Sequence, residues 1–306
     1  MAEFKAWAEL VRQSMGGLHV FLPVRDLGID GVVHRLADGA YIAIQVKGRT
    51  ELTSAGQVHI TVTASSFMDD VALLICVLAE EEVLGPMVLV VAESKFRELA
   101  VHNVVDGREY LTAAFQMHAG GRSRWAPYLV ERARLADRFG AGLAEAQPGE
   151  RSDAVHVDRG REGFLGEIEI VRRLAEGVSL NLFRPFPDLE TVEVLARHLS
   201  SHRFLGLQVK TIGWDQAHLE NRIYVRRSSF RPSPSTFVTV LGWNRDAGRF
   251  EDDLLLIPSE DIPSIARIKG DWMMLELEPG GIKHRRLEQY RTPLITLGST
   301  VEAMLV

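Results

Sequence analysis

Two places in the sequence carry, at the same spacing, side chains that could build a hydrolytic metal site. In each, an acidic residue stands fifteen positions before the glutamine of a Gln-x-Lys triplet. The two triads are Asp30, Gln45 and Lys47, and Glu193, Gln208 and Lys210. Carboxylate and amide oxygens suit a hard divalent cation such as Mg²⁺, so the acid and the glutamine are predicted metal ligands. The lysine could orient or help deprotonate a metal-bound water, which makes all six residues predicted catalytic residues.

The elements expected around the first triad would bring its members together. Side chains alternate along a strand, so Gln45 and Lys47 face the same side. Asp38-Gly39 predicts a tight hairpin, across which Asp30 can approach that side. The expected helices are 3–15, 94–100 and 127–139, and the expected strands are 18–24, 29–36, 40–47, 57–64, 71–78 and 87–92. This order predicts an α/β (α+β) fold with a mixed central sheet flanked by helices.

The second triad lies in a copy of the same pattern. Residues 41–47 (YIAIQVK) match residues 204–210 (FLGLQVK) at an offset of 163, and Ser-Ser-Phe at 65–67 recurs at 228–230 at that same offset. Further matches on both sides lie at offsets from 160 to 166, as loop insertions and deletions would leave them. The sequence therefore predicts two tandem domains. The predicted boundaries are 1–145 for the first repeat, 146–160 for the linker and 161–306 for the second repeat.

A helix, an acid, a hairpin and a Gln-x-Lys strand, in this order, resemble the PD-(D/E)xK nuclease superfamily, which has the restriction-endonuclease-like fold. The Gln-x-Lys form resembles its Mrr-type branch. The resemblance implies hydrolysis of phosphodiester bonds in DNA with Mg²⁺ or Mn²⁺, here by an intramolecular pseudo-dimer. Family members often add an acid on the first helix, and the matching positions are Glu9 and Glu169. Glu193 departs from the usual aspartate and lacks the glycines that flank Asp30.

Basic residues follow paired glycines in both repeats and could hold phosphates, with Trp125 expected to stack on bases. The predicted nucleic-acid contacts are Arg122 and Arg124 in the first repeat and Lys283, Arg285 and Arg286 in the second, to which Arg226 and Arg227 add two further cations. Solvated loops explain the same residues equally well. The second half has 21 basic residues against 14 in the first. It is therefore expected to contribute more to nucleic-acid contact, while the first repeat keeps the metal chemistry.

Composition limits the function classes. The chain has 306 residues and a net charge of -6, which excludes a strongly cationic DNA-coating protein but leaves room for a local basic groove. Cys76 is the single cysteine and lies in an apolar run, so it is expected in the core, in a reducing cytosol. No signal peptide is visible, and no apolar run approaches the ~20 residues of a membrane helix. A soluble cytoplasmic protein without a membrane partner is expected, and its oligomeric state stays open.

Two other function classes compete with a nuclease. A catalytically degenerate nuclease-fold module that binds nucleic acid or protein is the main alternative, and the negative net charge favours it because non-specific DNA affinity rests on cation–phosphate contacts. A nucleotide-binding α/β enzyme is a weaker alternative. The sequence has neither a Gly-x-x-x-x-Gly-Lys-Ser/Thr motif nor a strand-borne Gly-x-Gly-x-x-Gly.

Overall fold

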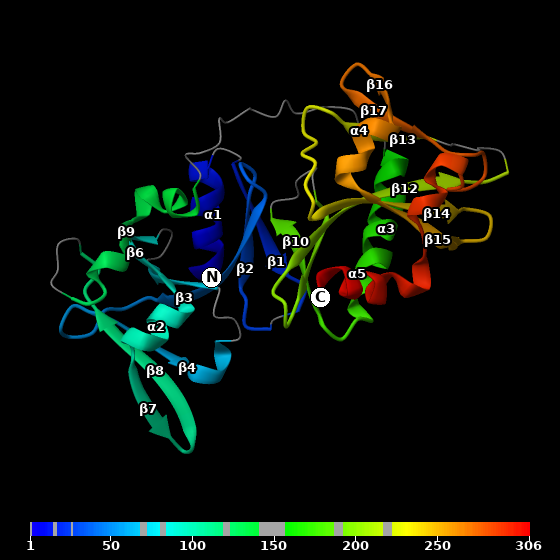
Figure 1. Ribbon diagram of the computed structural model, residues 1–306. Helices are drawn as coiled ribbons and strands as arrows, with labels where there is room; N and C mark the ends of the chain where they lie inside the picture. Colours follow the sequence, from blue (N-terminus) through cyan, green and yellow to red (C-terminus); the bar gives the residue numbers. More distant parts are fainter. Residues whose placement is uncertain are drawn as a thin grey trace. The chain divides into compact units, whose positions relative to one another are not determined.

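The structure is a computed structural model in which two compact units, Met1–Pro148 and Gly149–Val306, divide the chain (Figure 1). It describes residues 2–14, 17–25, 27–67, 72–79, 84–118, 123–140, 157–186, 192–216 and 222–306. The division falls within the segment 146–160.

Unit 1 begins with helix α1 (Ala2–Ser14), which packs against strands of a mixed sheet. Ala6, Leu10 and Ser14 are buried because residues four apart share one face of a helix. The sheet order is β1-β2-β3-β5-β6-β9, in which only the β3–β5 pair is parallel. The bounds are Leu18–Pro23 (β1), Gly31–Arg35 (β2), Ala40–Arg49 (β3), Leu73–Ala79 (β5), Leu84–Ala92 (β6) and Leu129–Glu131 (β9), with α2 at Glu93–Leu99.

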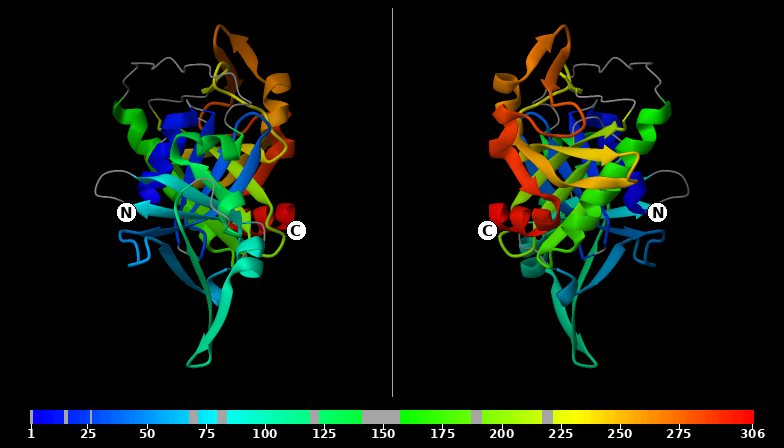
Figure 2. Two further views of the ribbon diagram at one scale, coloured as in Figure 1. Left: turned by 90° about the vertical axis from the view of Figure 1, so that its left-hand side faces the viewer. Right: turned by 90° about the vertical axis from the view of Figure 1, so that its right-hand side faces the viewer.

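A small antiparallel sheet covers one face of this central sheet. Its order is β4-β8-β7, with bounds Val58–Thr63 (β4), Val101–Val105 (β7) and Arg108–Phe115 (β8), and the β7–β8 hairpin projects from the rest of unit 1 (Figure 1, Figure 2). In the β3–β5 ladder Gln45 lies opposite Leu74 and Lys47 opposite Cys76. Leu74 and Cys76 belong to a buried cluster with side chains of β4 and β8. Gln45 and Lys47 therefore lie on the sheet face that β4 and β8 cover.

Unit 2 has the same topology. Its central sheet has the order β10-β11-β12-β14-β15-β18, with only β12–β14 parallel, and its small sheet has the order β13-β17-β16. The central strands are Leu180–Phe186 (β10), Val194–His198 (β11), Phe204–Trp214 (β12), Thr236–Asn244 (β14), Arg249–Pro258 (β15) and Arg291–Pro293 (β18). The small-sheet strands are Arg222–Arg226 (β13), Arg267–Lys269 (β16) and Trp272–Glu276 (β17). The helices are α3 (Val157–Ala175), α4 (Ile262–Ile265) and α5 (Leu297–Leu305).

The two units therefore correspond strand for strand, each central strand of unit 2 occupying the place of its counterpart in unit 1. Gln208 lies opposite Val238 and Lys210 opposite Val240, and both valines share a buried cluster with side chains of β13 and β17. Gln-x-Lys thus has the same place in the third strand of both units. A shared topology with matching sequence segments is what duplication of one domain would leave.

The predicted mixed sheet flanked by helices is confirmed, whereas the predicted helix at 127–139 is wrong. Residues 127–139 form no single helix: strand β9 and short 3-10 helices at 126–128, 132–134 and 136–139 occupy this segment. The β7–β8 hairpin is not among the elements expected from the sequence. Of the predicted linker, residues 157–160 are already helical in α3, and residues 146–156 lie outside the described part.

Cys76 is a core residue, as expected. Its side chain is fully buried, and burial raises the pKa of the thiol to about 12. The thiol is therefore protonated at neutral pH and cannot act as a nucleophile. None of the helices in the described part of the chain is both long and apolar enough to cross a membrane.

Gly31 at the start of β2 shows how closely α1 packs beside the first triad. A Cβ built there would lie 2.7 Å from Cζ2 of the buried Trp7 and 3.3 Å from the carbonyl oxygen of Phe21. We expect Gly31→Val to lower the free energy of unfolding by about 1–3 kcal/mol, the usual cost of overpacking a core. Chemical denaturation followed by circular dichroism measures it. Gly163→Ala in α3 is the control and should be neutral or slightly stabilising, because nothing lies within 4 Å of its added Cβ.

Candidate functional site

The first triad converges where β3 continues beyond the start of β2. Asp30 directly precedes β2, and its backbone N–H donates to the Ile44 carbonyl over 2.9 Å. Its carboxylate Oδ2 accepts a hydrogen bond of 2.7 Å from the backbone N–H of Val46. Val46 is the middle residue of Gln-x-Lys, so the carboxylate of Asp30 is held against the backbone between Gln45 and Lys47.

Gln45 is fixed in orientation and almost completely buried, with 2% of its surface exposed. Its Nε2 donates to the carbonyl oxygens of Gly28 at 3.0 Å and Ser66 at 3.4 Å. Its Oε1 is buried, and no donor among the described residues reaches it. Because buried polar atoms nearly always have a partner, this oxygen suits a bound cation or water.

Lys47 is half-buried and lies on the same sheet face as Gln45, two residues further along β3. It forms no ion pair with the part of the chain that the structure describes. A lysine that is not neutralised by a neighbouring carboxylate keeps its charge for a ligand or for a developing negative charge.

The second triad repeats the arrangement. The backbone N–H of Glu193 donates to the Leu207 carbonyl over 2.9 Å, and Glu193 Oε2 accepts from the backbone N–H of Val209 over 2.8 Å. The longer glutamate therefore reaches the same backbone position that Asp30 reaches in unit 1, without the flanking glycines. In addition, Lys210 Nζ lies 3.5 Å from Glu193 Oε1, so acid and lysine already form an ion pair here.

The pKa of Glu193 is raised to about 7, chiefly by burial and to a smaller degree by the nearby carboxylate of Glu167, while Lys210 and the Val209 N–H act in the opposite direction. The carboxyl group is thus partly protonated near neutral pH. A buried carboxyl group with a lysine and a second carboxylate beside it has the electrostatics typical of functional sites.

The two predicted helix acids are bound by arginines. Glu9 accepts from Arg12 at 2.6 Å and from Gln13 at 3.0 Å, and Glu169 accepts from Arg172 at 2.7 Å and from Arg173 at 2.8 Å. These hydrogen bonds, that of Arg172 first, lower the pKa of Glu169. Both acids therefore have cationic partners within their own helix, and their role as metal ligands stays a prediction.

The acid of α3 that raises the pKa of Glu193 is Glu167, whereas the sequence predicts Glu169 for this position. Glu167 also forms an ion pair of 2.6 Å with Arg184 of β10. Residues two apart on a helix point in nearly opposite directions, so Glu167 and Glu169 cannot both face the same triad. At the offset of 160 that aligns the two helices, unit 1 has the buried Trp7 in place of Glu167. The two units therefore differ in whether the helix contributes a carboxylate.

The predicted nucleic-acid contacts in unit 1 are only partly described. Arg122 lies outside the described residues. Arg124 is exposed, with its guanidinium 5.8 Å from the ring centre of Trp125. The prediction that Trp125 stacks on bases is wrong, because its ring is only 1% exposed and packs against Phe96 and Phe115.

In unit 2 the predicted basic residues differ in availability. Arg226 is half-buried, and its Nε lies 3.1 Å from Oδ2 of Asp271, so part of its charge is neutralised. The remaining residues are exposed, which leaves their charges accessible to a phosphate backbone. They are Arg227, Lys283, Arg285 and Arg286.

Each triad offers a metal ion few protein ligands. Among the residues that the structure describes, no group of three or more His, Cys, Asp or Glu is placed to hold a metal ion. Each triad offers one carboxylate and one glutamine, and Mg²⁺ commonly takes one or two carboxylates and completes its shell with water and substrate phosphate. The donor set fits such an ion. A comparison of the chain with protein-family models, curated proteins and solved structures finds no match.

Proposed function

We propose that the protein is a metal-dependent hydrolase of phosphodiester bonds in DNA, with unit 1 as its hydrolytic centre. One observation carries the proposal. An acid carboxylate accepts a hydrogen bond from the middle residue of Gln-x-Lys in both units, Asp30 from Val46 over 2.7 Å and Glu193 from Val209 over 2.8 Å. A single such contact can arise by chance. Its recurrence at equivalent places of one topology supports a constellation that was assembled before the domain was duplicated.

In unit 1 the carboxylate of Asp30 and Oε1 of Gln45 would hold Mg²⁺ or Mn²⁺. When bound, the ion would supply Lewis-acid stabilisation of phosphoryl charge and would acidify a coordinated water. The two carbonyl groups that bind Gln45 Nε2 keep Oε1 turned away from them. Lys47, on the same face, would orient the attacking water and offset the negative charge that develops on the phosphate.

Unit 2 favours the second candidate function, nucleic-acid binding by a catalytically degenerate centre. Its lysine is already paired with its acid at 3.5 Å, and Glu193 has a pKa of about 7 because it is buried. Both features weaken a carboxylate as a cation ligand. The exposed cations of unit 2, among them Arg285 and Arg286, support contact with a phosphate backbone.

Asp30→Asn tests the proposed hydrolytic centre. The amide oxygen of asparagine can still accept from the Val46 N–H, so the fold should persist while the negative charge is lost. We expect cleavage of supercoiled plasmid with Mn²⁺ to fall by at least about 100-fold. Asp38→Asn is the matched control, since Asp38 is an exposed acid of the same hairpin, bound to Arg35 at 2.6 Å. Cleavage by Asp30→Asn at the wild-type rate would remove unit 1 from the mechanism.

A further inference from the structure

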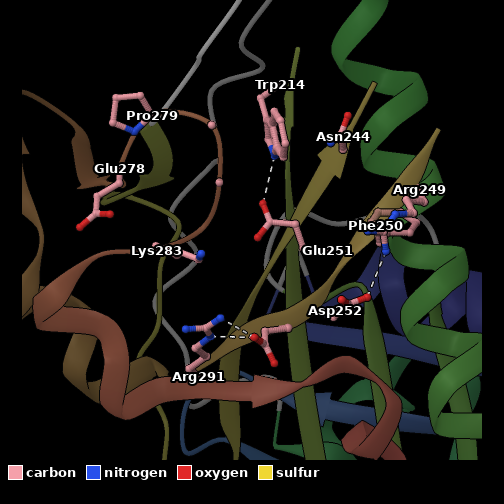
Figure 3. Close-up of a pocket in the computed structure, with 13 residues that line it drawn as sticks. Trp214, Asn244, Arg249, Phe250, Glu251, Asp252, Glu278, Pro279, Lys283 and Arg291 are labelled. Atoms are coloured by element: carbon pink, nitrogen blue, oxygen red, sulfur yellow. Dashed lines mark hydrogen bonds and ion pairs between the residues drawn. The ribbon is translucent and has the colours of Figure 1, made fainter. Parts of the chain in front are cut away.

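Unit 2 contains a cavity of about 420 Å³ at the ends of three central strands (Figure 3). Trp214 of β12, Asn244 of β14 and Glu251 of β15 line it, together with Lys283 from the loop after β17. Neither triad contributes a residue to the lining. The volume lies within the range of about 300–1,000 Å³ that small-molecule sites occupy.

The carboxylate of Glu251 is held in place at the cavity wall. Its Oε1 accepts a hydrogen bond of 3.0 Å from Nε1 of Trp214. The β14–β15 pairing shifts register at Gly242, where an added Cβ would lie 2.5 Å from Glu251 Oε1; at Gly281 the distance would be 3.2 Å. Glu251 thus occupies space that two glycines leave open, and the bond to Trp214 fixes the indole ring beside it.

Three basic side chains line the cavity beside four carboxylates, and Lys283 is the one whose charge stays available, because Arg249 is paired with Asp252 and Arg291 with Asp253. Its loop is closed by a hydrogen bond of 2.7 Å from the Glu278 N–H to the Lys283 carbonyl, and Gly280 adopts a left-handed conformation with φ of 77°. Figure 3 shows the Lys283 side chain directed into the cavity. Lys283 forms no ion pair with any residue that the structure describes, whereas Arg291 is paired with Asp253 at 2.8 Å.

We propose that this cavity binds a nucleotide whose base carries an exocyclic amino group. The base would stack on Trp214 and donate its amino group to Glu251, and the phosphate would lie against Lys283. Aromatic rings are the usual platforms for bases, carboxylates accept from the cytosine amino group, and lysine is a common phosphate ligand. A free mononucleotide and one nucleotide of a single strand share this chemistry. The proposed nucleotide site lies in unit 2 alone, and binding there requires no hydrolysis.

Tryptophan fluorescence and calorimetric titration of the full chain in EDTA test the proposal independently of the metal centre. The probes are dCMP, dTMP, inorganic phosphate and a ten-residue deoxycytidine oligonucleotide. We expect dCMP to bind at least tenfold more tightly than dTMP, because thymine has no amino group for Glu251. Preference for dCMP over the oligonucleotide identifies a free-nucleotide site, and the reverse preference identifies a single-strand site. Both support the proposal.

Two variants locate the binding. Lys283→Ala should lower the affinity for dCMP at least fivefold. Glu251→Gln should reduce the preference for dCMP over dTMP, because the side-chain amide of glutamine can donate a hydrogen bond to thymine. Lys269→Ala, an exposed lysine of β16, is the matched control and should change neither. Three results with the wild-type protein would overturn the proposal. They are no binding of any nucleotide, equal affinities for dCMP and dTMP, and an affinity for inorganic phosphate equal to that for dCMP.

Discussion

Lys47→Ala is expected to lower metal-dependent DNA cleavage by at least about 100-fold while the fold and DNA affinity stay near those of the wild type. Lys47 is half-buried and forms no ion pair within the described part of the chain, so its removal breaks no ionic contact there. The variant instead loses stabilisation of the transition state. A positioned charge or proton donor raises the rate of such a step by about 10²–10⁴-fold. Initial rates on supercoiled plasmid and filter binding measure the two effects separately.

Lys210→Ala is the matched variant in unit 2. Because Lys210 is paired with Glu193 at 3.5 Å, its loss leaves a buried carboxyl group without its cation and should change cleavage by only a few-fold. If Lys47→Ala cleaves at the wild-type rate, unit 1 is not the hydrolytic centre. If Lys210→Ala alone abolishes cleavage, the hydrolytic centre lies in unit 2.

Glu193→Gln is expected to stabilise the protein at high pH. Burial raises the pKa of Glu193 from 4.5 to about 7, so folding favours the protonated form. The stability that this group contributes is fully present below about pH 4.5 and is lost as pH rises through 7. Glutamine stays neutral throughout. The variant should therefore have a free energy of unfolding about 2–3 kcal/mol higher than the wild type at pH 8, and a nearly equal one at pH 4.5.

Urea denaturation in EDTA at pH 4.5 and pH 8 measures this difference. Glu176→Gln, which removes a half-exposed carboxylate of the ion pair with Arg172, is the control and should change stability by less than about 1 kcal/mol at either pH. A Glu193→Gln variant that is less stable than the wild type at pH 8 would show that the ion pair with Lys210 outweighs the burial of the carboxylate.

The parts of the fold that follow from local signals could be predicted from the sequence. Asp38-Gly39 lies between β2 and β3 as a hairpin turn, with Gly39 at φ of 71°, and the apolar runs became β5 and β6. The β7–β8 hairpin could not be predicted in this way, because Val101–Val105 is exposed along its whole length and has no alternation of burial. Strand β9 forms by pairing with β6, in which Met87 lies opposite Glu131. No local sequence pattern reveals this long-range pairing.

The triads were accessible to sequence reasoning because the chain contains two copies of them, and register-consistent matches are harder to obtain by chance than one motif. The surroundings were not accessible. Whether Glu167 or Glu169 lies close enough to raise the pKa of Glu193 depends on how α3 is rotated against the sheet. Burial of Trp125 depends on packing against Phe96 and Phe115 from distant segments. In both cases tertiary contacts decide the outcome, and a residue type alone cannot.

Anomalous diffraction from crystals soaked in Mn²⁺ tests the central claim most directly. The account predicts a manganese peak in unit 1 between the carboxylate of Asp30 and Oε1 of Gln45, and loss of that peak in crystals of Asp30→Asn. A soaked wild-type crystal with no peak at this position, or with manganese bound only elsewhere in the protein, would contradict the account.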